Sequence, residues 1–285
     1  FAISFSQPVT RYGYTDREKV NYPGGFRRFN TAENFPEIGG RKVVSYFEFK
    51  EGSAPLEIKV ALSAVGTDGA VKNLQAEATG KSFDTIRQET NGKWENALSV
   101  IDAEGSNDQL SMLYTSLYHT MINPSVYMDV DRKYRGIDHN IHQAEGFTNY
   151  TVFSVWDTYR ALHLFNIIKR DVSTDLVKSM LAHYSQSVHH LLPVWSHMGN
   201  ENWCMIGYHS VSVLADAITK GLPIDKQEAV KAMVSSSNVP YYDHTDEYKQ
   251  LGYVPFDQSP TSASITLENA YEDWTVYHTA LLLGD

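Results

Sequence analysis

The run Gly146–Arg160, GFTNYTVFSVWDTYR, separates two kinds of sequence pattern. Residues before it alternate in the manner of β-strands, and residues after it repeat with helical spacing. The run contains one aspartate and one arginine, Asp157 and Arg160. It also contains five aromatic side chains: Phe147, Tyr150, Phe153, Trp156 and Tyr159. We therefore expect a change of architecture here, together with the least ordinary chemistry of the chain.

The composition describes a soluble globular protein of one large or two ordinary domains, because 42% of its 285 residues are hydrophobic and 20% are charged. A net charge of −10 without any Lys/Arg cluster argues against a nucleic-acid partner. No apolar run is long enough to span a bilayer. The single cysteine, Cys204, excludes an internal disulfide and leaves the compartment open. We expect Cys204 to be a small buried hydrophobic residue.

The pattern over residues 1–90 predicts β-structure. The segments FAISFSQPVTRYGY (1–14), RKVVSYFEFK (41–50) and LEIKVALSAVG (56–66) alternate apolar and polar residues. Turn-forming clusters separate them at residues 22–25, 39–40 and 51–53. We interpret this part as the C-terminal portion of an antiparallel β-sandwich. Since a strand is already under way at Phe1, we expect the chain to be a piece of a longer protein.

Helical spacing begins near Ala70 and dominates after Phe153. Residues 107–122 predict a helix capped by Asn107 or Asp108 and ended by Pro124. Further helices are predicted near residues 154–168, 172–190, 203–220, 225–235 and 261–283. The domain organisation that follows has three parts: a partial β-sandwich over 1–90, a helical linker and connecting segment over 91–150, and a helical domain over 151–285.

The Asp129-Val130-Asp131 segment has a spacing that occurs in calcium loops. Glycine is absent from the sixth position of such a loop and glutamate from the twelfth. We therefore predict a turn or short hairpin here.

The segment Trp156–Arg160 has two open interpretations. Asp157 and Arg160 are three residues apart, so they could form an ion pair within one helix. Alternatively, the Asp157 carboxylate accepts hydrogen bonds from sugar hydroxyls while Trp156 lies against the apolar face of the sugar.

The run Val194–His209, VWSHMGNENWCMIGYH, is similarly ambiguous. Asn200 could cap a helix with Glu201 in its first turn, or both side chains could face a cleft. His209 lies on an apolar helical pattern, where a core histidine is more common than a ligand. The sequence contains no His-Glu-x-x-His zinc pattern and no nucleotide-binding glycine motif.

The segments GFTNYTVFSVWDTYRALH (146–163) and GNENWCMIGYHSVSVLADAITKG (199–221) together resemble glycoside hydrolase family 92, the calcium-dependent exo-acting α-mannosidases. The likeness continues in order from about residue 40 to the end of the chain. It includes FDTIRQETNGKWENALSVIDAEG (83–105), LYTSLYHTMINPSVYMDVDRKYRGID (113–138) and LENAYEDWTVYHTALLLG (267–284). One departure is ALHLFNII, where the family leads us to expect proline after the histidine.

The resemblance implies a multidomain β + α fold, in which part of a β-sandwich is followed by a helical linker and about half of an (α/α)6 barrel. It implies hydrolysis of terminal mannose, with α-1,2 linkages as the expected substrate, by an inverting mechanism with calcium as cofactor. The implied partners are mannose-containing glycans of the N-glycan or yeast mannan type. The implied location is secreted or periplasmic.

Carried over position by position, the resemblance assigns substrate contacts to Trp156, Asp157, Asn200 and Glu201, and less strongly to Arg160 and His209. We expect the general acid, the general base and most calcium ligands to lie beyond Asp285, so no catalytic residue and no metal ligand is assigned in this chain. A non-catalytic carbohydrate-binding piece remains the alternative. Another (α/α)6 enzyme, a lyase or a phosphorylase, rests on analogy of fold alone.

Overall fold

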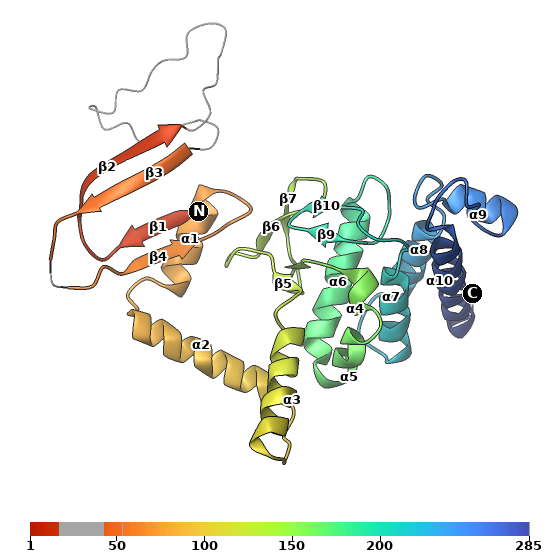
Figure 1. The fold of residues 1–285 in the computed structure, drawn as a ribbon, viewed down its shortest axis with the longest axis horizontal. Helices are drawn as coiled ribbons and strands as arrows, with labels where there is room; N and C mark the ends of the chain where they lie inside the picture. Colours follow the sequence, from red (N-terminus) through yellow and green to blue (C-terminus); the bar gives the residue numbers. More distant parts are fainter. Residues whose placement is uncertain (17–42, 53, 285) are drawn as a thin grey trace, which may run out of the picture. The chain divides into compact units, whose positions relative to one another are not determined.

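The computed structural model describes residues 1–16, 43–52 and 54–284, so the turns predicted at residues 22–25 and 39–40, and position 53 of the third turn, lie outside the described residues. The chain divides into a β-rich unit over residues 2–61 and a helical unit from residue 62 onward (Figure 1).

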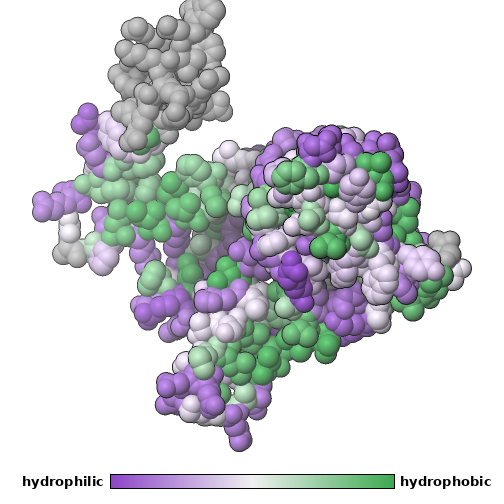
Figure 2. All heavy atoms as spheres, turned by 45° about the vertical axis from the view of Figure 1, so that its right-hand side comes forward, coloured by the Kyte–Doolittle hydropathy of each residue, from purple (hydrophilic) through white to green (hydrophobic). Residues whose placement is uncertain are grey.

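The β-rich unit consists of two small antiparallel sheets. In one, β1 (Ala2–Phe5) pairs with β4 (Ile58–Ala61); in the other, β2 (Val9–Asp16) pairs with β3 (Val43–Phe49). The strands predicted in these segments are therefore confirmed. Several of their large side chains are exposed: Val44, Tyr46, Phe47, Ile58 and Val60. Figure 2 shows green, hydrophobic surface over this unit.

The helical unit begins with α1 (Thr67–Glu77), α2 (Phe83–Leu98) and α3 (Asn107–Thr120), which confirms the change to helical spacing near Ala70. The cap of α3 is Ser106, so the predicted caps Asn107 and Asp108 are wrong by one and two positions. Its hydroxyl accepts the N–H of Gln109, whose side chain accepts the Ser106 N–H in return. This reciprocal capping box satisfies two backbone donors at the start of the helix.

Short strands follow α3. The strand β5 (Ser125–Val126) pairs with β8 (Tyr150–Thr151), and β6 (Lys133–Arg135) pairs with β7 (Ile141–Gln143). Asp129 precedes the β6–β7 hairpin and is buried, where its carboxylate accepts hydrogen bonds from Ser63 Oγ (2.7 Å) and Asn73 Nδ2 (2.8 Å). The predicted turn at 129–131 is confirmed.

Four helices share the main hydrophobic core: α6 (Arg170–Gln186), α7 (Ser210–Thr219), α8 (Lys226–Ser236) and α10 (Ser262–Leu283). They lie close together in Figure 1. The short α9 (Thr245–Leu251) precedes α10. The core is lined by fully buried apolar side chains, among them Leu191, Leu192, Val211, Leu214 and Met233.

The predicted helices at 225–235 and 261–283 are confirmed by α8 and α10. The predicted helix at 154–168 is wrong, because Ala161 leaves the helical region at φ −142° and divides the segment. It forms α4 (Val155–Thr158), a 3-10 turn (Leu162–Leu164) and α5 (Phe165–Ile168).

Two predicted helix ends also differ. The helix predicted at 172–190 is α6, which ends at Gln186 because Ser187 is extended, with ψ 127°. The helix predicted from residue 203 begins only at Ser210, because Trp203 and Met205 have left-handed φ values of 54° and 66°. Among the described helices, none combines the length and the hydrophobicity needed to cross a membrane.

The contact between Asn73 and Asp129 generates a stability prediction. Asn73 Nδ2 also donates to the Leu62 carbonyl, and Asn73 Oδ1 accepts the N–H of Val130. We expect Asn73→Ala to lower the free energy of unfolding by about 1–3 kcal/mol, because the buried carboxylate loses a donor. Urea denaturation measures the change. Gln75→Ala, an exposed change on the same helix, should have almost no effect; equal losses in both variants would contradict the prediction.

Candidate functional site

Backbone hydrogen bonds join the two runs that the sequence singles out. The N–H of Phe153 donates to the Ser196 carbonyl (2.9 Å), and the N–H of Val155 donates to the Val194 carbonyl (3.2 Å). Thr151 Oγ1 accepts the N–H of Met198 at 2.7 Å. The start of α4 is therefore fixed against the segment that leads into the hairpin of β9 (Ser196–His197) and β10 (Asn200–Glu201).

Arg160 lies over two aromatic rings. Its guanidinium carbon is 5.2 Å from the centroid of the Trp156 ring and 4.7 Å from that of Tyr159, within the range of cation–π attraction. Arg160 Nη1 also donates to the Tyr159 hydroxyl at 2.9 Å. The indole N–H of Trp156 is buried and has no hydrogen-bond acceptor among the described residues. A buried donor of this kind commonly bonds to a water or a ligand.

His209 is buried and packs against Tyr159. Its ring is stacked on Tyr159, with centroids 4.2 Å apart and planes inclined by 2°. Only 2% of the His209 surface is exposed, so the prediction of a core histidine is confirmed. Its Nδ1 lies 2.6 Å from Glu272 Oε1, and its Nε2 lies 3.5 Å from Glu268 Oε2.

Glu272 is fully buried on α10, and both of its oxygens accept the backbone N–H of Tyr208 at 2.8 Å. Burial, together with the neighbouring carboxylates of Glu268 and Asp243, raises the pKa of Glu272 well above its ordinary value. Burial lowers the pKa of His209 to about 4. Burial therefore disfavours the charged form of both members of this pair, Glu272 and His209.

Asp157 and Asn200 are both exposed. Asp157 follows Trp156 on α4, and the described structure shows no ion pair between it and Arg160. The guanidinium of Arg160 instead points toward Glu268, with Nη2 3.9 Å from Oε1. Asn200 lies on β10 and donates weakly to the Met198 carbonyl at 3.5 Å. The structure thus brings Trp156, Arg160 and His209 into one cluster, with Asp157 adjacent in the chain.

Glu201 points inward, and only 8% of its side chain is exposed. Its carboxylate accepts four backbone N–H groups at 2.8–3.2 Å, those of Val194, Trp195, Asn202 and Trp203. A carboxylate with this many donors is bound to its own loop. Its neighbour Asn200 is therefore better placed for contact with a ligand.

Two residues of this cluster, Glu268 and Glu272, were not assigned from the sequence. Their spacing of four residues places them on one face of α10, which is a signal that the sequence did contain. The contact with His209 was not readable, because 63 positions separate it from Glu272 (272 − 209).

Cys204 is exposed, so the prediction of a buried hydrophobic residue is wrong. Its neighbours Trp203 and Met205 both have positive φ, which interrupts the helical spacing that would have turned Cys204 inward.

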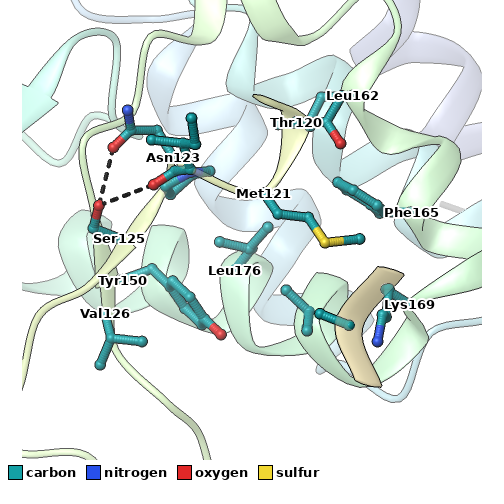
Figure 3. Close-up of a pocket in the computed structure, with 14 residues that line it drawn as sticks. Thr120, Met121, Asn123, Ser125, Val126, Tyr150, Leu162, Phe165, Lys169 and Leu176 are labelled. Atoms are coloured by element: carbon teal, nitrogen blue, oxygen red, sulfur yellow. Dashed lines mark hydrogen bonds between the residues drawn. The ribbon is translucent and has the colours of Figure 1, made fainter. Parts of the chain in front are cut away.

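A cavity of about 390 Å³ lies where the end of α3 meets α5 and α6 (Figure 3). Met121, Phe165 and Leu176 contribute apolar walls, and Lys169 supplies a cation at its edge. None of the six predicted site residues lines it. Because sugar recognition needs several converging polar groups, this cavity is a poor candidate for the sugar site.

No three His, Cys, Asp or Glu side chains in residues 1–16, 43–52 and 54–284 lie close enough together to hold a metal ion. Calcium in proteins has six to eight oxygen ligands. The described residues therefore do not by themselves form the calcium site that the resemblance implies.

Residues 69–285 match the model of the glycosyl hydrolase family 92 catalytic domain. Among solved structures, the chain is similar to a family 92 α-mannosidase from Bacteroides thetaiotaomicron, with 39% identity and a TM-score of 0.85 over 99% of this chain and 38% of that one. The complex of that enzyme with mannoimidazole has the same identity and TM-score, over 99% of this chain and 37% of that one.

A family 92 inverting mannosidase from the same organism shares 28% identity, with a TM-score of 0.85 over 99% of this chain and 38% of that one. The chain thus spans 37–38% of the length of these solved relatives. No curated protein matches the chain.

Gly207 provides a test of the contact around Glu272. Its φ is +78°, and a Cβ there would lie 2.8 Å from Glu272 Oε1 and 2.9 Å from His209 Nε2. We expect Gly207→Ala to lower the free energy of unfolding by about 1–3 kcal/mol more than Gly252→Ala. Gly252 is a matched control, because its φ is +80° and its Cβ would meet open space. Thermal or urea denaturation compares the two variants. Equal losses of stability would show that the strained backbone, and not the contact with Glu272 and His209, causes the effect.

The buried side chain of His163 should make the free energy of unfolding depend on pH. Burial lowers its pKa to about 4 from 6.5, so the folded state resists protonation that the unfolded chain accepts. Its contribution to stability is present above pH 6.5 and is lost as the pH falls through about 4. We expect the loss between pH 7 and 4 to be smaller in His163→Gln by an amount on the order of 1–3 kcal/mol.

Urea denaturation of both proteins at several pH values measures this difference. His119→Gln, a change at an exposed histidine, is the control and should follow the wild type. Parallel profiles for the wild type and His163→Gln would contradict the assignment.

Proposed function

The chain belongs to glycosyl hydrolase family 92, and from this membership we propose that the whole protein is an exo-acting α-mannosidase that removes terminal mannose from glycans. The observation that carries the proposal is the cluster of Trp156, Arg160 and Tyr159 above the buried His209. Trp156, Tyr159 and Arg160 lie in one of the two segments that carry the resemblance to the family, and His209 lies in the other. Similarity to an α-mannosidase that was solved with mannoimidazole supports the same substrate class.

The chemistry of this cluster suits a pyranose ring. A sugar presents C–H groups on its faces and hydroxyls around its rim, so it binds where an aromatic face adjoins polar groups. Trp156 is partly exposed, and its buried indole N–H has no acceptor among the described residues. Asp157 and Arg160 add an exposed carboxylate and an exposed guanidinium. Both can hydrogen-bond to hydroxyls.

Within this proposal the six predicted residues have different tasks. Trp156, Asp157 and Arg160 contact the terminal mannose, and Asn200 contacts the glycan from β10. His209 holds Tyr159 in place beneath Arg160. Glu201 holds the loop that follows β10.

We propose an inverting reaction, as in the relative described as an inverting mannosidase. Inversion needs one carboxylic acid to protonate the leaving oxygen and a carboxylate roughly 6.5–9.5 Å away to activate water. We assign this acid and base to parts of the protein outside this chain. The chain's own task is to bind and orient the terminal sugar.

Calcium remains part of the proposal at the level of the family only. The described residues do not fit a calcium site alone, so its ligands would have to come from elsewhere in the protein. No step of the reaction is assigned to the ion here.

The finer architecture is also proposed. Residues 1–90 would contain the end of a β-sandwich, residues 91–150 a linker, and residues 151–285 about half of an (α/α)6 barrel. The strands β1–β4 support the first part, and the shared core of α6, α7, α8 and α10 supports the third. The strands end at Ala61, and the helices α1 and α2 begin before residue 90, so the boundary of the sandwich lies earlier than position 90. Cleavage of α-1,2 linkages in N-glycans or yeast mannan, and a secreted or periplasmic location, complete the proposal.

Kinetics of the full-length protein test the proposed function. We expect it to release mannose from α-1,2-mannobiose, with β-mannose as the first product seen by NMR, and to lose activity in a chelator until calcium is restored. Asp157→Ala should lower kcat/KM by about tenfold to a hundredfold, since a charged hydrogen bond to the sugar is lost.

The matched control is Asp171→Ala, which removes an exposed carboxylate from the first turn of α6. It should leave kcat/KM unchanged. Absence of mannose release from every α-mannoside tried would refute the mannosidase. Equal activity of wild type and Asp157→Ala would refute the role of Asp157.

A further inference from the structure

Three loops bring a second set of aromatic side chains to the surface. His189 follows α6, Trp203 follows β10, and Tyr241 follows α8. The rings of Trp203 and Tyr241 both meet His189 edge to face, at centroid distances of 5.3 and 5.4 Å. Trp203 and Tyr241 are 40% and 65% exposed and His189 is exposed as well, so this group, here called the aromatic platform, faces solvent.

The backbone at Trp203 is strained, and the indole of this residue is exposed. Its φ of 54° is a left-handed value that a bulky side chain rarely adopts. Strain of this kind persists only where the surroundings enforce it, and it is concentrated at functional sites. Here the Glu201 carboxylate enforces it by accepting the N–H groups of Asn202 and Trp203.

The same carboxylate ties the platform to the proposed sugar site. Glu201 Oε2 accepts the N–H of Val194 at 3.0 Å, and the Val194 carbonyl accepts the N–H of Val155 at the start of α4. Trp156 is the next residue of α4. The loop that displays Trp203 and the helix that displays Trp156 therefore share one hydrogen-bonded frame.

The chemistry of the platform selects a neutral, amphipathic ligand. Aromatic faces bind the C–H side of a sugar ring. The hydrogen bond between His189 Nδ1 and the Tyr241 hydroxyl fixes both polar groups and leaves His189 Nε2 for a ligand hydroxyl. The exposed side chains of Asn200 and Asn202 lie three positions and one position before Trp203 in the chain and add further hydrogen-bonding groups.

We propose that His189, Trp203 and Tyr241 bind a sugar ring of the glycan beyond the mannose that is removed, and that Glu201 is the positioning residue that displays Trp203. This inference rests on the proposed function for its substrate class. It assigns a second binding position to the same glycan, at residues distinct from Trp156, Asp157 and Arg160.

The test uses the full-length protein with two substrates, α-mannosyl fluoride, which offers one ring, and α-1,2-mannobiose, which offers two. Trp203→Asn removes the indole and keeps the left-handed backbone, because asparagine tolerates positive φ. We expect it to raise KM for mannobiose about three- to tenfold and to leave both constants for the fluoride unchanged. Trp203→Tyr, which retains an aromatic face, should restore most of the affinity.

Glu201→Gln should raise the same KM, because the amide N–H₂ repels the backbone donors that hold Trp203. Tyr253→Asn, which removes an exposed aromatic ring elsewhere, is the control and should match the wild type. Equal loss on both substrates would show that Trp203 acts only on the fold or on the first sugar, and would overturn the platform.

Calorimetry with mannobiose separates this inference from the proposed function. If the wild type hydrolyses neither these two substrates nor any other α-mannoside tried, the mannosidase is refuted, and the binding constants decide the platform. Weaker mannobiose binding by Trp203→Asn than by the wild type supports it. Equal or undetectable binding by both proteins overturns it.

Discussion

The buried carboxylate of Glu272 accepts the Tyr208 N–H with both oxygens and lies 2.6 Å from His209 Nδ1. A carboxyl group with no exposed surface is tolerable only when it is hydrogen-bonded and its charge is shared or neutralised. The Tyr208 N–H and the close approach of His209 provide the polar surroundings of this carboxyl group. The same approach places the imidazole against Tyr159, and Tyr159 in turn contacts Arg160, which lies above Trp156.

In this region, the main task of the carboxylates is to accept hydrogen bonds from backbone N–H groups. Glu201 binds four N–H groups between Val194 and Trp203, Asp243 binds the N–H of Gly207, and Glu272 binds the next N–H. Together they shape the loop that joins β10 to α7, including its left-handed residues. An acidic residue in such a loop resembles a catalytic or sugar-binding group in sequence, yet here its oxygens are already used. Beside these bound carboxylates, the side chains left for a ligand are aromatic, amide and cationic ones and the exposed carboxylate of Asp157.

Much of the helical part was predictable, because long apolar periodicity reports burial directly. The helix α10 was expected at 261–283 and is found at Ser262–Leu283, and His209 was expected in the core and is found there. The segment 203–209 also has helical spacing but is a loop. Its shape depends on Asp243 and Glu272, which are 36 and 64 positions away from the N–H groups they bind, and spacing within the segment cannot report those contacts. The inward direction of Glu201 could not be predicted either, because the same residue types occur in a capped helix and in a loop whose N–H groups bind a carboxylate.

A crystal structure of the full-length protein with mannoimidazole would test which residues bind the sugar and which residues hold the backbone in place. The ring of the inhibitor should lie against the indole of Trp156, with Asp157 or Arg160 within hydrogen-bonding distance of its hydroxyls, while Glu201 and Glu272 keep their backbone partners. An inhibitor bound elsewhere, touching none of Trp156, Asp157 and Arg160, would contradict the assignment of this cluster to the sugar.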